Sequence, residues 1–218
     1  MATAKKQSRG GQSRYGGGDV DPNDIVSESD MIVEHGNYQT EIDDVLSVSK
    51  DLLDIYGQDV PLQQFFIAEM RGKGKNVLGY YDGANIAINE RFLDTAAMNK
   101  AYEECVKAGF HPNNGNKSGM QAVVAHEFGH AATDAVARKM GLTGTFALHS
   151  AADRIVGEAA KATGHRGVVK MAAKISRYAT HSNAEAVAEA FADVYCNGKK
   201  ATKESQAIVN VMNKYLKS

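Results

Sequence analysis

The sequence contains few cysteines. Cys105 and Cys196 are the two in the chain of 218 residues, and they lie far apart. They form neither a CxxC metal pair nor the dense framework of a disulfide-stabilised protein. This usage favours a reduced, intracellular setting. We expect both thiols to be free and buried on helix faces.

Long apolar runs are also missing. The N-terminal region lacks the apolar stretch of about 7–15 residues that defines a secretory signal peptide. The longest apolar runs elsewhere are far too short to cross a bilayer. We therefore expect a soluble protein made in the cytoplasm, with no membrane partner. Release by a route without a signal peptide, or packaging into a virion, remains open at this stage.

The charge is nearly balanced, with a formal net charge of -1. Such a balance predicts no nucleic-acid partner for the chain as a whole. Residues 1–28 differ, because they are rich in Gly, Ser, Gln and Arg and lack apolar periodicity, which predicts a disordered arm. The arm is basic, since four cations precede the first acid: Lys5, Lys6, Arg9 and Arg14. It is either a solvated leader or a segment that docks on nucleic acid or an acidic partner.

Residues 29–218 predict one domain of the α+β class, with a small mixed sheet early and helices late. An amphipathic helix at 41–56 precedes a strand at 64–70. Residues 78–90, LGYYDGANIAINE, predict a β-hairpin that turns at Asp82-Gly83. The remaining helices are expected at 95–109, 119–140, 145–163, 166–177, 183–196 and 202–216.

The helix at 119–140 contains the sequence HEFGH. Its histidines, His126 and His130, are four residues apart, so both imidazoles lie on one face and can reach one tetrahedral zinc. Glu127 points about 100° around the helix, from where it can take a proton from a zinc-bound water. Two solvent-facing histidines are the alternative. The apolar or small neighbours instead favour a buried helix, in which these polar groups need partners.

A catalytic zinc usually has three protein ligands. The metzincin continuation of HExxH is absent, because the positions it requires hold Thr133 and Val136. Three side chains in residues 177–195 are candidates for the third ligand: Glu185, Glu189 and His181. Spacing favours Glu185, although a capping box at the start of its helix is another explanation for that residue. Glu189 also fits a solvated helix face.

HEFGHAATD, followed downstream by Tyr178 and NAEAVAEAFAD, resembles the gluzincin branch of zinc peptidases. The resemblance is greatest to the catalytic domain of anthrax lethal factor and to metallopeptidase-like domains of phage head proteins. It implies a zincin-like fold in which Glu185 is the third ligand and Glu189 supports the ligands from behind. It also implies that Tyr178 donates its phenol to the developing oxyanion. In such enzymes an edge strand aligns the substrate, and Asn85–Asn89 fits that place.

Other polar residues near the motif are less distinctive. Asp134, one turn after His130, is predicted to accept a proton from a ligand imidazole, with a surface acid as the alternative. Tyr80 and Tyr81 are expected in the core rather than in a cleft. The remaining histidines are expected to be structural, exposed or without a role: His35, His111, His149 and His165.

The sequence therefore predicts a zinc-dependent, gluzincin-like peptidase that hydrolyses peptide bonds of peptide or protein substrates. Zn²⁺ is the expected cofactor. The alternative is a phage virion or head-assembly component that retains the zinc site with limited or no proteolytic activity and contacts other phage structural proteins. A secreted toxin or effector peptidase is a further alternative, disfavoured by the missing signal peptide.

Overall fold

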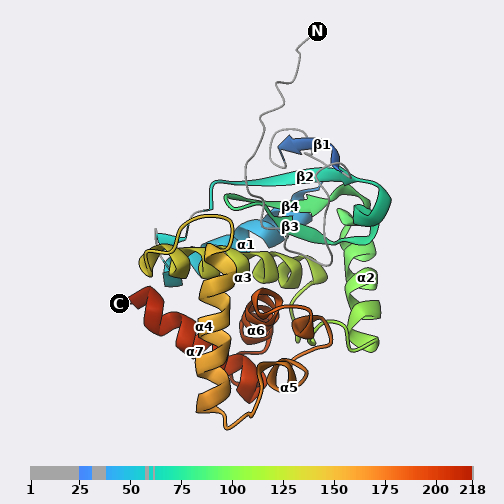
Figure 1. Cartoon of the computed structure of the whole chain (residues 1–218). Helices are drawn as coiled ribbons and strands as arrows, with labels where there is room; N and C mark the ends of the chain where they lie inside the picture. Colours follow the sequence, from blue (N-terminus) through green and yellow to red (C-terminus); the bar gives the residue numbers. More distant parts are fainter. Residues whose placement is uncertain (1–24, 31–37, 57–58, 61, 218) are drawn as a thin grey trace.

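The structure is a computed structural model that describes residues 25–30, 38–56, 59–60 and 62–217. It is a mixed α+β fold in which a small sheet lies on one side of the long helix α3 and several helices lie on the other (Figure 1). The strands are β1 (Ile25–Asp30), β2 (Gln64–Met70), β3 (Gly79–Tyr81) and β4 (Asn85–Asn89). The helices are α1 (Gln39–Tyr56), α2 (Thr95–Lys107), α3 (Gly119–Lys139), α4 (Ala147–Ala162), α5 (Val168–Ala172), α6 (Asn183–Asn197) and α7 (Lys203–Lys217).

The sheet has the order β1-β2-β4-β3. β1 and β3 pair antiparallel with their neighbours, whereas β2 and β4 are parallel. The predicted hairpin of β3 and β4 is confirmed, and Asp82 shapes its turn by accepting hydrogen bonds from the backbone N–H groups of Ala84 and Asn85 at 2.9 and 2.8 Å. The prediction that Asn85–Asn89 is an edge strand is wrong. β4 lies between two strands because β2 pairs with its far side, and the edge strands are β3 and β1.

The predicted disordered arm requires a correction at its end. Residues 1–24 lie outside the described residues, but residues 25–28 belong to β1. The backbone of β1 pairs with β2 in the register Ile25↔Met70 to Asp30↔Phe66, with an irregularity after Ile25. The composition of residues 25–28 gave no sign of this strand. β1 is formed by backbone hydrogen bonds to a distant segment, β2, and these leave no local apolar periodicity in the sequence.

α3 is the central element and is buried along most of its length. Ser118 accepts a hydrogen bond from the Gln121 backbone and the Gln121 side chain returns one to Ser118, so the predicted capping box is present. Gly141, with φ 70°, ends the helix in the left-handed conformation that glycine adopts without strain. The helix is thus held at both ends, with its middle turns between sheet and helical half.

α1 joins the domain from its N-terminal side. Its carboxylates reach the starts of two other helices: Glu41 accepts from the Thr95 backbone at 2.8 Å, and Asp44 accepts from the Ser118 hydroxyl at 2.5 Å. Acids at these helix N-termini satisfy orphan donors and complement the helix dipoles. Its apolar face contributes fully buried side chains to the main core, namely Val45, Val48 and Leu52.

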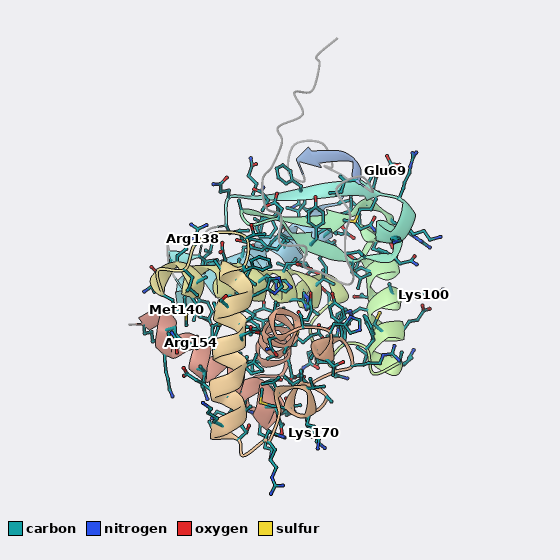
Figure 2. The ribbon with its side chains drawn as sticks, viewed as in Figure 1. Glu69, Lys100, Arg138, Met140, Arg154 and Lys170 are labelled. Atoms are coloured by element: carbon teal, nitrogen blue, oxygen red, sulfur yellow. The ribbon has the colours of Figure 1, made fainter. Side chains whose placement is uncertain are left out.

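Charged side chains lie mainly on the outside. Figure 2 shows Lys100, Arg154 and Lys170 pointing away from α2, α4 and α5, and all three are exposed. Tyr80 and Tyr81 are buried, as predicted. Among the described residues, no helix is both long and apolar enough to cross a membrane.

Two local expectations differ from the structure. The helix predicted at 166–177 is shorter, since α5 covers Val168–Ala172 and a single 3-10 turn follows at Tyr178–Thr180. Both cysteines are free, as predicted, but they are half-buried rather than buried. Cys105 faces a cavity beside α3, which accounts for its exposure.

Candidate active site

Three side chains from α3 and α6 converge in the interior. Oε2 of Glu185 lies 3.2 Å from Nε2 of His126 and 3.5 Å from Nε2 of His130. The three donor atoms lie within 4.8 Å of one another, and all three residues are buried. Atoms at such separations can share one tetrahedral cation with ligand bonds of about 2.0–2.2 Å. The structure therefore places Glu185, among the three candidates, with the two histidines of HEFGH.

The donor set fits zinc chemically, because two imidazoles and one carboxylate are the ligands of many catalytic zinc sites. Nε2 of His126 and Oε2 of Glu185 make no well-aligned hydrogen bond with any described group, although both are buried. Buried polar atoms are rarely left in this way. A metal at the cluster would satisfy both, since an imidazole nitrogen and a carboxylate oxygen each have a lone pair to donate.

Glu189 lies behind the cluster, one helical turn after Glu185. Its Oε1 lies 2.8 Å from Nδ1 of His126 and 2.9 Å from Nδ1 of His111, and its Oε2 accepts the Ser176 hydroxyl at 2.7 Å. A carboxylate on Nδ1 selects the tautomer that leaves Nε2 free to bind a metal. Glu189 is therefore positioned to orient His126 from behind.

Tyr178 and His111 are held together at the rim of this cluster. The backbone N–H groups of Arg177 and Tyr178 donate to the carbonyls of Gly109 and Phe110, at 2.9 and 3.1 Å. The ring of Tyr178 lies 5.9 Å from the ring of His126 and 5.4 Å from that of His111. Tyr178 therefore lies beside the cluster, and its role as an oxyanion donor stays a prediction.

His111 is the residue that sequence reasoning missed. It lies in a loop rich in turn residues, where nothing local distinguishes it from a surface histidine. Its side chain is 9% exposed, stacks on the ring of Tyr102 at 5.5 Å and pairs with Glu189. The contact with Glu189 joins residues 78 positions apart, so neither periodicity nor spacing could have indicated it.

Glu127 is almost completely buried and lines a cavity together with His126. One of its oxygens, Oε2, has no hydrogen-bond partner among the described groups. Burial raises the pKa of Glu127 to about 8, and the nearby His126 only partly opposes this rise. A carboxylate with a raised pKa is the kind of group that exchanges protons near neutral pH.

The groups around the cluster have shifted pKa values for related reasons. Burial opposes ionisation of Glu189, but the charge of His111 and hydrogen bonds from His111 and His126 hold its pKa at about 2. Burial would lower the pKa of His111, but the Glu189 carboxylate and the Cys105 side chain raise it to about 9. A charged His111 therefore faces an ionised Glu189 at neutral pH, which strengthens their hydrogen bond.

Two other predicted candidates lie away from the cluster. Asp134 is one turn further along α3, and its carboxylate accepts from the Tyr81 hydroxyl and from Arg138, both at 3.3 Å. These partners draw it towards β3, so its predicted bond to a ligand imidazole is not present. His181 is exposed, and its ring packs on those of Tyr178 and Phe110.

The close packing of α3 on α6 depends on Gly129. A Cβ atom at this position would lie 2.9 Å from Cα of Ala188 and 3.0 Å from Cβ of Phe191, closer than real Cβ contacts allow. Gly129 precedes His130, and Ala188 precedes Glu189. The glycine of HEFGH therefore lets the two helices approach until the carboxylates of α6 meet the imidazoles of α3.

Comparison with known proteins gives one family. A family model described as peptidase family M48 matches residues 57–218, which is most of the chain and includes every residue of the cluster. Neither the curated proteins nor the solved structures yield a match to the chain.

Proposed function

Because the chain belongs to peptidase family M48, whose members are zinc-dependent metallopeptidases, we propose that it hydrolyses peptide bonds at the cluster of His126, His130 and Glu185. The observation that carries the proposal is the convergence of three buried ligand atoms beside a buried carboxylate, Glu127. In this proposal the site is of the gluzincin type and the fold is zincin-like, since the third ligand is a glutamate from α6, a helix downstream of HExxH.

The three ligand residues hold the zinc in this proposal. When bound, zinc would lower the pKa of water at the site and polarise the peptide carbonyl. Glu189 keeps the His126 imidazole in the tautomer that presents Nε2 to the cluster, as its 2.8 Å contact with Nδ1 supports. A proton on the ligand atoms competes with the metal for the same lone pairs, so zinc is retained less well in acid.

Glu127 is the general base. It takes a proton from the attacking water and passes it to the nitrogen of the leaving amine, so it ends the cycle ionised. Its buried position beside the cluster suits both transfers. The Tyr178 phenol is the donor that stabilises the oxyanion in the transition state, a role supported by its position beside His126.

The substrates are peptides or proteins. The alternative that the chain is a phage virion component has no support from the comparisons. A cytoplasmic location remains a prediction.

We place the start of the peptidase domain at β1, residue 25, rather than at residue 29, since β1 extends the sheet.

The test combines metal analysis with one substitution. The purified chain is expected to hold about one zinc per molecule and to cut a mixed peptide library. Glu127→Gln keeps the shape of the side chain but removes the base, so zinc should stay and hydrolysis should be lost. Glu103→Gln, at an exposed position on α2, is the matched control and should change neither. A chain without zinc, or an active Glu127→Gln variant, would contradict the proposal.

A further inference from the structure

A cavity with a volume of about 50 Å³ lies directly beside the proposed metal cluster. One side of it is formed by His126 and Glu127, which are a proposed ligand and the proposed base. The remaining walls come from the chain entering β3, from α2, from Phe110 and His111 in the following loop, from Val123 on α3 and from Glu189 on α6. A peptide whose carbonyl lies at the cluster would thus have a neighbouring side chain next to this opening.

The walls away from the cluster are mainly apolar. Leu78, Tyr102 and Val123 contribute to them, and each of these side chains is less than one-tenth exposed. Tyr102 is fixed in place, because its hydroxyl donates to the Pro112 carbonyl at 3.1 Å and its ring stacks on His111. The cavity is therefore preformed, which reduces the entropy cost of filling it.

The volume limits what the cavity can hold. A water molecule needs about 10–15 Å³, so a cavity of about 50 Å³ accommodates roughly three to five groups of that size. This corresponds to a side chain such as Val or Leu and is less than a Phe or Trp side chain requires. A charged side chain would lose its hydration against the apolar walls, because the carboxylates in the lining are Glu127, the proposed base, and Glu189, which already bonds to His111, His126 and Ser176.

We propose that this cavity is the substrate subsite for a Val- or Leu-sized apolar side chain on a residue next to the cleaved bond, with Cys105 in its wall limiting its size. The inference rests on the proposed peptidase function. Cys105 is half-buried on α2 and forms no disulfide, so its side chain can be changed without opening the main core.

The first experiment measures selectivity. Purified full-length, zinc-loaded variants are given peptides that differ only at one residue beside the cleaved bond. The unmodified chain should favour Val or Leu over Phe and Lys by about tenfold or more in kcat/KM, the range that a fitted apolar pocket supplies. Cys105→Ala should shift the preference towards Phe, and Cys105→Phe should shift it towards Ala. Cys196→Ala, outside the cavity, is the matched control.

The second experiment does not depend on turnover. In the zinc-loaded Cys196→Ala chain, the rate at which N-ethylmaleimide alkylates Cys105 is followed by mass spectrometry. Leucine hydroxamate, which carries a metal-binding group and an apolar side chain, should slow the alkylation several-fold. Lysine hydroxamate should slow it much less. Zinc content and thermal unfolding of each variant show whether it is folded.

The outcomes separate the inference from the proposed function. If zinc is bound and peptides are cut, but neither Cys105 substitution changes the preference, the subsite is wrong and the peptidase function stands. Equal protection of Cys105 by both hydroxamates would overturn the subsite in the same way. If the chain holds no zinc, the proposed function fails, and the inference fails with it.

Discussion

Nδ1 of His126 and Oε1 of Glu189 lie 2.8 Å apart, and this contact joins the two helices at the heart of the cluster. The same carboxylate also binds His111 and Ser176. Ser176 in turn accepts the backbone N–H of Ala179, next to Tyr178. One buried carboxylate therefore connects a proposed ligand, a loop histidine and the turn that carries the proposed oxyanion donor.

The carboxylates of α6 are predicted to differ in their effect on zinc. Glu185→Ala removes a ligand and should weaken zinc binding strongly. Glu189→Ala removes no proposed ligand but the hydrogen-bond partner of His126, His111 and Ser176, so zinc affinity should fall by about 10–100-fold. Competition with a chelator of known affinity measures both, with the exposed Glu103→Ala as the control. The opposite order would make Glu189 the ligand.

His111 is predicted to position Glu189. His111→Ala removes one of the three hydrogen bonds to this carboxylate, so zinc affinity should fall, but by less than in Glu189→Ala. The matched control is His181→Ala, because His181 also packs on Tyr178 and Phe110 but does not contact Glu189. Zinc affinity should be unchanged in this control. An equal loss in the two variants would mean that His111 acts only through ring packing.

Gly129→Ala is predicted to destabilise the fold. The added Cβ meets Cα of Ala188, a backbone atom that cannot turn aside, so the helices must separate. Overpacking of this kind costs about 1–3 kcal/mol. A denaturant titration measures this loss as a lower free energy of unfolding. Zinc affinity should also fall, because the helices that carry the proposed ligands separate.

Gly157→Ala supplies the contrast to this variant. Gly157 lies within α4, and a Cβ there would meet nothing within 4 Å. Because alanine favours helix over glycine, this change should stabilise the chain by about 0.5–1 kcal/mol. If both substitutions changed the free energy of unfolding in the same direction, steric contact with α6 would not explain the effect at Gly129.

α1 is predicted to be required for folding, although the family match starts after it. It buries Ile42, Val45, Val48 and Leu52, each contributing roughly 1.5–3 kcal/mol. The sum is comparable to the total stability of a typical domain, about 5–15 kcal/mol. A chain that starts at residue 58 should therefore show no cooperative thermal unfolding. One that starts at residue 25 should unfold like the full chain, and a stable shorter chain would refute this prediction.

Local signals in the sequence predicted most of the helices and strands well. The capping box at Ser118 and the glycine at 141 define both ends of α3 by interactions within a few residues. The spacing of His126 and His130 likewise depends only on helix geometry. Such features could be predicted because the atoms involved are neighbours in sequence.

The remaining features depend on contacts between distant segments. Asp134 has the right spacing to support His130, but Tyr81 on β3 and Arg138 compete for its carboxylate. β4 was expected at the edge of the sheet, and its pairing with β2 could not be read from the hairpin alone. His111 is brought to Glu189 by backbone bonds between residues 109–110 and 177–178.

The division of the cluster between α3 and α6 has a consequence during synthesis. A ribosome delivers HEFGH well before the glutamates of α6, and the two meet only where Gly129 allows the helices to touch. Until that docking, a chain has two histidines and a base but no complete set of ligands. On the proposed function, hydrolysis therefore requires the docking of α6 on α3, and the HEFGH helix alone does not confer it.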